Sequence, residues 1–150
     1  MPIYPSHSSP TDSGDEAIFA TGGTEFIENW HYVSATGFRL PSNSQKGNQI
    51  WYWSNHVDWR LGETGFYLFT ECNWYHYLSS ANALGVPVGG MDLFNLGSVD
   101  IAGENTVTGA YGVKYKPAPN MEIGLAYEIP YSHRRDILQN RFTLDFIVRY

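Results

Sequence analysis

Few residues of this chain could do chemistry, and the clearest set is two histidines with one carboxylate: His31, His56 and Glu71. Two imidazoles and a carboxylate are ligands that suit zinc or non-haem iron. The three residues lie far apart in the sequence, so only strand pairing can bring them together. Hairpin turns at 41–47 and 62–65 would set His31 opposite His56 and His56 opposite Glu71. We expect a polar network of these side chains, keep a metal site as a weak alternative, and predict no cofactor.

Signatures of catalysis are missing elsewhere in the sequence. No serine lies in a G-x-S-x-G motif, and the glycine-rich segment 85–90 lacks the Lys and Ser/Thr that complete a phosphate-binding loop. Cys72 is the single cysteine, which excludes a disulfide within the chain and a cysteine-based zinc site. We therefore predict that the protein is not an enzyme.

The elements that would position these residues are predicted from the alternation of apolar and polar residues. This period of two dominates from residue 24 onward and is typical of β-strands. It predicts an all-β, antiparallel meander of about six strands over residues 24–150. The predicted strands are 25–40, 48–61, 66–78, 106–116, 120–129 and 141–150. Proline at positions 2, 5 and 10 predicts an irregular N-terminal arm over residues 1–23.

The predicted connections alternate between long and tight when they are followed back from the C-terminus. Residues 130–139 and 79–105 are long, residues 117–119 and 62–65 are tight, and residues 41–47 are intermediate. In a meander, this alternation collects the tight turns at one end of the sheet and the long loops at the other.

Charged residues on the polar face of the last three strands allow the strand register to be predicted. A turn at 117–119 sets Lys114 opposite Glu122, and the next hairpin sets Glu128 opposite Arg141 and places Asp145 near Gly124. Opposite charges then meet across neighbouring strands, which stabilises each pair by roughly 0.2–1 kcal/mol. We predict an inward-facing polar network of these charged residues: Lys114, Glu122, Glu128, Arg141 and Asp145.

Composition excludes two further classes of protein. A net charge of -6 argues against a nucleic-acid partner, because phosphate binding needs a basic surface. No run of about 18 apolar residues is present, so a transmembrane helix is not predicted. The mean hydropathy of -0.32 remains compatible with a membrane β-barrel, since only alternate residues of such strands face lipid.

The last ten residues, Arg-Phe-Thr-Leu-Asp-Phe-Ile-Val-Arg-Tyr at 141–150, form an alternating strand that ends on an aromatic residue. With the strand alternation and the loop pattern, they make the chain resemble the C-terminal part of bacterial outer-membrane β-barrel proteins, whose short turns face the periplasm. The resemblance implies part of a transmembrane β-barrel, with a final strand that is the signal for the barrel-assembly machinery. The residues matching this signal are Phe142, Leu144, Phe146, Val148 and Tyr150, and they would face lipid.

Two departures from the family shape the expected context. Single-chain barrels have at least about eight strands, and the N-terminus here lacks the basic and apolar regions of a secretory signal. We therefore expect the C-terminal fragment of a longer barrel, with its start missing from this chain. The resemblance implies a porin-like, transporter-like or structural role in the outer membrane of a Gram-negative bacterium. The implied partners are membrane lipid, the assembly machinery, and the remaining strands or other protomers.

The alternative is a soluble β-barrel or sandwich that binds a small apolar or sugar ligand. Its faces would be reversed, with apolar and aromatic residues lining an interior pocket and charges outside. The missing signal sequence favours this alternative, whereas the loop pattern and the terminal aromatic residue favour the membrane barrel.

Overall fold

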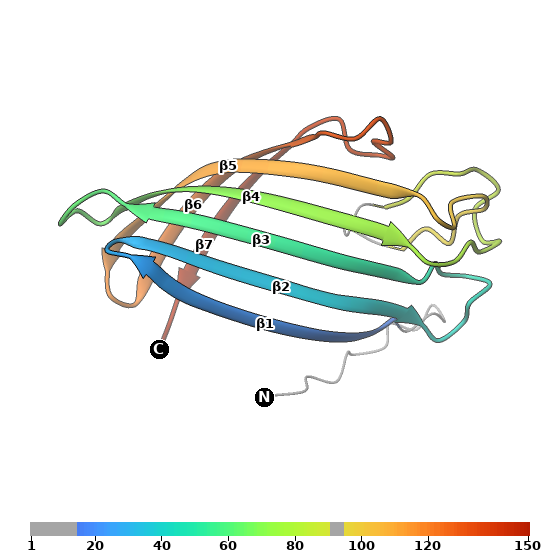
Figure 1. The fold of residues 1–150 in the computed structure, drawn as a ribbon, viewed down its shortest axis with the longest axis horizontal. Helices are drawn as coiled ribbons and strands as arrows, with labels where there is room; N and C mark the ends of the chain where they lie inside the picture. The colour runs from blue at the N-terminus through green and yellow to red at the C-terminus, as the bar shows by residue number, and fades with distance from the viewer. Residues whose placement is uncertain (1–14, 91–94) are drawn as a thin grey trace.

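The computed structural model describes residues 15–90 and 95–150, and all the strands named in them belong to one antiparallel sheet. The strands are β1 (Asp15–Ile27), β2 (Trp30–Pro41), β3 (Ile50–Arg60), β4 (Phe66–Tyr77), β5 (Asn105–Ala118), β6 (Met121–Pro130) and β7 (Arg141–Val148). Their order in the seven-stranded sheet follows the sequence, so β1 and β7 are its open edges (Figure 1). The predicted all-β antiparallel meander is confirmed.

The first strand is the main difference from the prediction, which had about six strands where the structure has seven. Residues 15–23, expected in an irregular arm, form most of β1 and pair with β2 from Asp15–Pro41 onward. This segment is rich in Ala, Thr and Gly and has no marked apolar face, so alternation does not reveal it. Hydrogen bonding to β2 compensates for the weak preference of this segment for the strand conformation. Residues 1–14 of the predicted arm lie outside the described residues.

A tight turn at Glu28 and Asn29 separates β1 from β2 and divides the single strand predicted at 25–40. Asn29 has a φ of 67°, a left-handed conformation that asparagine adopts more readily than most residues. Its backbone N–H donates to the Glu25 carboxylate at 2.9 Å, which closes the turn. The other five strands begin and end within two residues of their predicted bounds.

The connections differ in length at the two ends of the sheet. Residues 28–29, 61–65 and 119–120 make tight turns at one end, called the short-turn end below. Residues 42–49, 78–90, 95–104 and 131–140 lie at the opposite, long-loop end (Figure 1). Because β1 adds one more tight turn at the expected end, the alternation now extends over all six connections.

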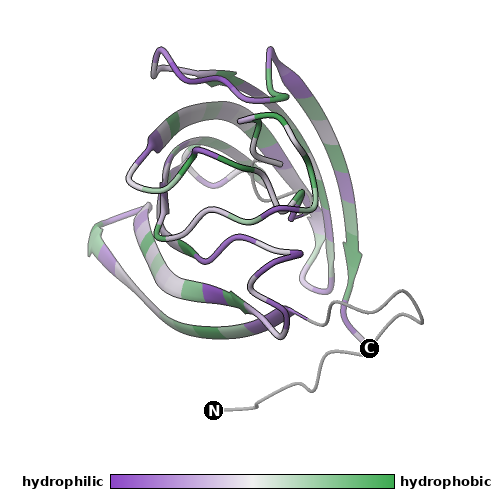
Figure 2. Ribbon diagram, turned by 90° about the vertical axis from the view of Figure 1, so that its right-hand side faces the viewer, coloured by the Kyte–Doolittle hydropathy of each residue, from purple (hydrophilic) through white to green (hydrophobic). Residues whose placement is uncertain are grey.

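The sheet curves into an arc around the loops of the long-loop end (Figure 2). On the inner side of this arc, Tyr75 and Tyr77 of β4 are buried in a cluster with Ile50, Ile101 and Leu138. The cluster fixes the loops 78–104 and 131–140 against the sheet. Since successive residues of a strand face opposite sides, the parity of Tyr75 and Tyr77 identifies the concave face, and the other parity identifies the convex face.

A buried asparagine holds the longest loop in place. The Asn48 side chain, from the loop between β2 and β3, donates to the carbonyls of Ser79 at 3.1 Å and Ser98 at 2.9 Å. Its oxygen accepts from the Ser98 backbone N–H at 2.7 Å, and Ser98 itself is fully buried. One side chain therefore satisfies three backbone groups of the loop 78–104.

Asn48→Ala should detach this loop without unfolding the sheet. We expect the free energy of unfolding to fall by about 2 kcal/mol, because buried backbone groups lose their partners, and proteases to cut within 78–104 earlier than in the wild type. Limited proteolysis with urea titration measures both effects. Asn82→Ala, an exposed asparagine of the same loop, is the control and should change neither. Equal cleavage of the two variants would contradict the role of Asn48 in holding the loop 78–104 in place.

Candidate functional site

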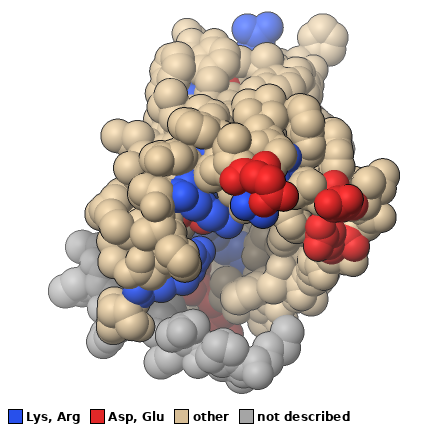
Figure 3. All heavy atoms as spheres, turned by 90° about the vertical axis from the view of Figure 1, so that its left-hand side faces the viewer, with Lys and Arg blue, Asp and Glu red and all other residues tan. Residues whose placement is uncertain are grey.

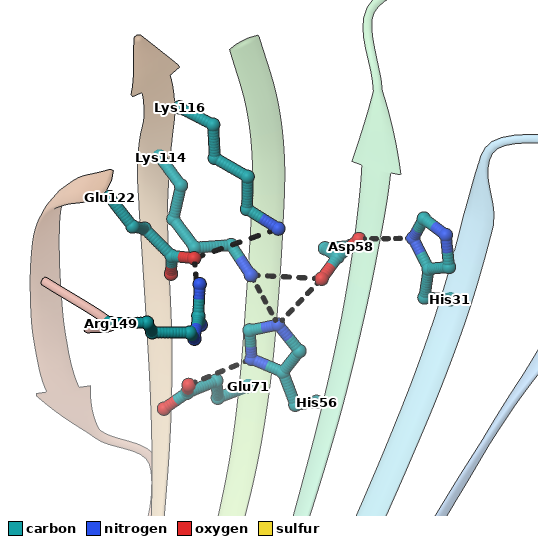
Figure 4. Close-up of polar contacts among 8 residues, drawn as sticks. All are labelled: His31, His56, Asp58, Glu71, Lys114, Lys116, Glu122 and Arg149. Atoms are coloured by element: carbon teal, nitrogen blue, oxygen red, sulfur yellow. Dashed lines mark hydrogen bonds and ion pairs between the residues drawn. The ribbon is translucent and has the colours of Figure 1, made fainter. Parts of the chain in front are cut away.

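The concave face carries a chain of charged side chains centred on Asp58 of β3 (Figure 4). Its carboxylate lies 2.7 Å from His31 Nδ1, 3.2 Å from His56 Nε2 and 2.9 Å from Lys114 Nζ. The other ring nitrogen of His56, Nδ1, lies 2.8 Å from a Glu71 oxygen. Asp58 and Lys114 come from β3 and β5, so their contact reaches over β4, which requires both side chains to lean across the concave side.

The three residues predicted as a metal-binding set are close together but do not converge on one point. His56 pairs with Glu71 in the predicted register, whereas His31 pairs with Asp58 instead of His56, a shift of two residues. The imidazoles therefore bind carboxylates, and Asp58 is the link between them that sequence reasoning missed. Among the described residues, no group of three or more His, Cys, Asp and Glu side chains is placed to hold a metal ion.

A second cluster lies beside the first, toward the short-turn end (Figure 4). The Glu122 carboxylate is 3.6 Å from Lys116 Nζ and 3.7 Å from an Arg149 nitrogen. The predicted partner of Glu122 was Lys114, which instead lies opposite Gly124. The difference arises because β5 continues through Ala118, with a register shift after Tyr115, so the turn falls later than predicted.

The last two strands carry an ion pair that contains the most buried carboxylate of the seven strands. Glu128 of β6 is 4% exposed and pairs with Arg141 of β7, in the predicted register. The Thr108 hydroxyl donates to the same carboxylate at 2.5 Å. Asp145 also lies opposite Gly124 as predicted, but no ion-pair partner for it is found among the described residues. The five residues of the predicted inward network thus share the concave face without forming one continuous network.

Removing the carboxylate at the centre of the first cluster should destabilise the fold. Asp58→Ala leaves Lys114 without its carboxylate partner and breaks the link between His31 and His56, which should lower the free energy of unfolding by about 1–3 kcal/mol. Urea titration followed by tryptophan fluorescence measures this loss. Asp145→Ala, the unpaired acid of the same face, is the control and should change stability by no more than about 0.5 kcal/mol. Equal effects of the two substitutions would show that the cluster contributes nothing.

Charge is also visible at the short-turn end of the molecule. In the view onto this end, Lys and Arg side chains lie inside a hollow, and Asp and Glu side chains lie both at its rim and deeper within it (Figure 3). Lys114, Lys116 and Arg149 belong to the concave face near this end, where each is matched by Asp58 or Glu122. The mixture of signs gives the concave face no clear preference for cations or anions.

The convex face is apolar and aromatic, in contrast to the concave face. All five tryptophans of the sequence lie on it, as the pairs Trp30–Trp59 and Trp53–Trp74 and the parity of Trp51 show. Many of its large apolar side chains are exposed, up to 75% for the side chain of Leu144. Soluble monomeric proteins rarely expose apolar patches of this extent, and such patches mark surfaces that contact a membrane, a partner protein or a ligand.

Aromatic rings gather at the two ends of the convex face. Toward the short-turn end, Trp30 stacks on Trp59 with ring centroids 5.6 Å apart, and Phe66 stacks on Tyr115 at 4.4 Å. Toward the long-loop end, the Trp51 ring meets Trp74 edge-on with ring centroids 4.9 Å apart and stacks on Phe38 at 6.0 Å. Aliphatic residues such as Val57 and Val113 lie between these clusters.

The aromatic cluster near the long-loop end borders an open groove with a volume of about 640 Å³. Its lining combines tryptophan rings with small polar side chains: Thr36, Trp51, Trp53, Asn55, Cys72, Trp74 and Val107. The Asn55 oxygen accepts from the Tyr32 hydroxyl at 2.6 Å and from the Ser34 hydroxyl at 3.2 Å. The groove is thus a mainly apolar surface with a polar strip at mid-sheet.

The residues assigned to the assembly signal lie on β7 and just beyond it. Phe142, Leu144, Phe146 and Val148 share the convex face, pairing with β6 from Tyr127 to Met121, and Tyr150 follows the strand end, fully exposed. The four strand residues form a row at one edge of the sheet, and no strand of residues 15–90 or 95–150 lies on their other side.

No protein-family model, curated protein or solved structure shows a significant match to this chain. In the described residues, no helix is long and apolar enough to cross a membrane.

Proposed function

We propose that this chain is a segment of an outer-membrane β-barrel, with a structural, pore or transporter-like role. The observation that carries the proposal is the inversion of the two faces. Charged residues such as Glu128, 4% exposed, are buried on the concave face, whereas the convex face exposes its tryptophans and leucines. Water favours the opposite arrangement, and a bilayer around a polar lumen favours this one.

Two further features support a transmembrane placement. Barrels of this class have short turns on the periplasmic side and longer loops outside, which matches the division of the connections between the two ends of this sheet. They also carry aromatic girdles at both interfaces around an apolar band, and the ring clusters around Trp59 and Trp51 have these positions. In this placement the C-terminus and the tight turns face the periplasm.

The same placement assigns roles to the terminal strand and to the concave face. The row from Phe142 to Val148, with Tyr150 behind it, would contact lipid and be bound by the barrel-assembly machinery. The charged clusters around Asp58 and Glu122 would line the lumen. Because their charges are balanced, we assign no solute to the lumen.

Expression in a Gram-negative host with an added secretion signal tests the proposal. The chain should be recovered in the outer-membrane fraction and should be extracted by detergent but not by urea or carbonate. Tyr150→Asp with Phe146→Asp should slow assembly, since both positions belong to the assigned signal, whereas Ile147→Asp on the opposite face should not. Recovery of the wild-type chain as a soluble periplasmic protein would contradict the proposal.

The groove on the convex face supports a second candidate function, a soluble protein that binds a sugar or a small apolar ligand. Tryptophan rings stack well on apolar sugar faces, and the Asn55 and Thr36 side chains at the groove offer hydrogen bonds. The form of this alternative that the sequence predicts has the aromatic residues inside, whereas the tryptophans lie on the outer, convex face of the sheet. A soluble chain whose tryptophan emission changes on titration with oligosaccharides would favour this candidate.

A further inference from the structure

We propose that an odd number of further strands closes this sheet in the membrane, in the simplest case one strand that pairs with both β7 and β1. The proposal rests on the membrane function proposed above and specifies the partner that the two open edges would bind. It follows from the directions of the edge strands, their unpaired backbone groups and one charged side chain on β7.

The directions of the edge strands determine whether an odd or an even number of strands can close the sheet. In a seven-stranded meander the odd-numbered strands run alike, so β1 and β7 both run from the long-loop end to the short-turn end (Figure 1). Direct pairing of β1 with β7 would therefore give a parallel seam. Joining several copies edge to edge would repeat that seam at every junction.

Bacterial single-chain barrels are antiparallel and have an even number of strands. An antiparallel closure needs a strand that runs from the short-turn end to the long-loop end, next to both edges. One such strand, or any odd number in alternation, satisfies this condition, whereas two strands do not. A single added strand would give about eight in total, the smallest number found in this class.

Open edges are costly in a bilayer. Half of the backbone N–H and C=O groups of β7 point away from β6, and hydrocarbon offers them no hydrogen bonds. Each unpaired group costs several kcal/mol there, which strongly favours pairing of both edges with a further strand. Leu144 of β7 is 75% exposed, against 48% for Leu125 of β6, which shows how much apolar surface a neighbouring strand covers.

The concave side of β7 indicates the chemistry of the neighbouring strand. Asp145 lies over Gly124, where a Cβ atom would approach its carboxylate to 2.6 Å, so β6 contributes no side chain to it. No ion-pair partner for Asp145 is found among the described residues, and the position beyond β7 is open. The closing strand should therefore carry a basic, amide or hydroxyl side chain facing Asp145, and apolar side chains beside Leu144 and Phe142.

Insertions that add one strand or two strands to the sheet test whether an odd number is needed to close it. A copy of residues 121–140, which is β6 with its following loop, is inserted before Asp15 and adds one strand in the required direction. A copy of residues 105–140 adds two strands of the same composition and is the matched control. Both insertions are made in the full chain, which is refolded in phosphatidylcholine vesicles beside the unmodified chain.

Hydrogen exchange of residues 141–148 is then measured by mass spectrometry. We expect the one-strand insertion to slow this exchange by more than about tenfold relative to both other proteins, because only there does β7 gain a partner on its free edge. Equal exchange in all three, or slow exchange in the unmodified chain, would overturn the proposal.

The membrane function can fail separately in the same samples. If all three proteins stay in solution without detergent and do not associate with vesicles, the membrane function itself is contradicted. If all three insert but the two-strand insertion protects β7 as well as the one-strand insertion does, only the inferred parity is contradicted.

Discussion

Leu144→Arg is expected to abolish stable insertion into vesicles, whereas Thr143→Arg is expected to be tolerated. The two residues are neighbours in the middle of β7 and both are exposed, but Leu144 lies on the convex face and Thr143 on the concave face. An arginine facing lipid near the bilayer midplane costs about 2–4 kcal/mol, whereas one facing the lumen stays in water.

The comparison separates the two candidate functions because both substitutions add the same side chain to the same strand. Flotation of refolded variants with vesicles gives the inserted fraction, and urea titration gives the loss in stability. A soluble protein would tolerate both arginines, since both sites are open to water. Similar insertion of the two variants would therefore contradict a lipid-facing convex surface.

Arg141→Met is expected to cause a larger loss of stability than the other substitutions of charged residues predicted here for the concave face. It leaves the Glu128 carboxylate, 4% exposed, without its charged partner and with Thr108 as its remaining hydrogen-bond donor. Breaking a buried ion pair by removing one partner costs about 3–5 kcal/mol. The loss should also loosen β7, because this pair joins β7 to β6 at the long-loop end.

Arg149→Met is the matched control for this substitution. Arg149 directly follows β7, and its side chain is 58% exposed and lies 3.7 Å from Glu122. Exposed pairs contribute at most about 1 kcal/mol, so this variant should be nearly as stable as the wild type. Adding Glu128→Gln to Arg141→Met should recover part of the loss by removing the unpaired charge. Equal losses in the free energy of unfolding for Arg141→Met and Arg149→Met would contradict the conclusion that burial of Glu128 makes its ion pair the stronger one.

The later part of the fold follows closely from the sequence, because alternation and turn residues agree there. From β3 to β7 the strands match the predicted bounds to within two residues, and Glu128–Arg141 and His56–Glu71 pair as predicted. In these hairpins a tight turn or a pair of opposite charges fixes the register. The prediction missed β1, whose small residues give no alternation and whose strand depends on β2.

The registers that differ from the prediction share one physical cause. A shift of two residues preserves the faces of a strand, so alternation cannot detect it. Lys114 therefore kept its face but lost Glu122 as its partner, and His31 kept its face but met Asp58. Trp30 lies directly opposite Trp59 only in the observed register of β2 and β3, and this favourable ring stacking could have been used to choose it.

Quenching of tryptophan fluorescence by brominated lipids tests the lipid-facing convex surface most directly. All five tryptophans lie on that face, so no substitution is needed and the emission reports on this surface alone. In vesicles that contain phosphatidylcholine brominated along its acyl chains, we predict blue-shifted emission that is strongly quenched, and little quenching by aqueous iodide. Emission that brominated lipid leaves unchanged and iodide quenches would contradict a membrane-embedded convex face.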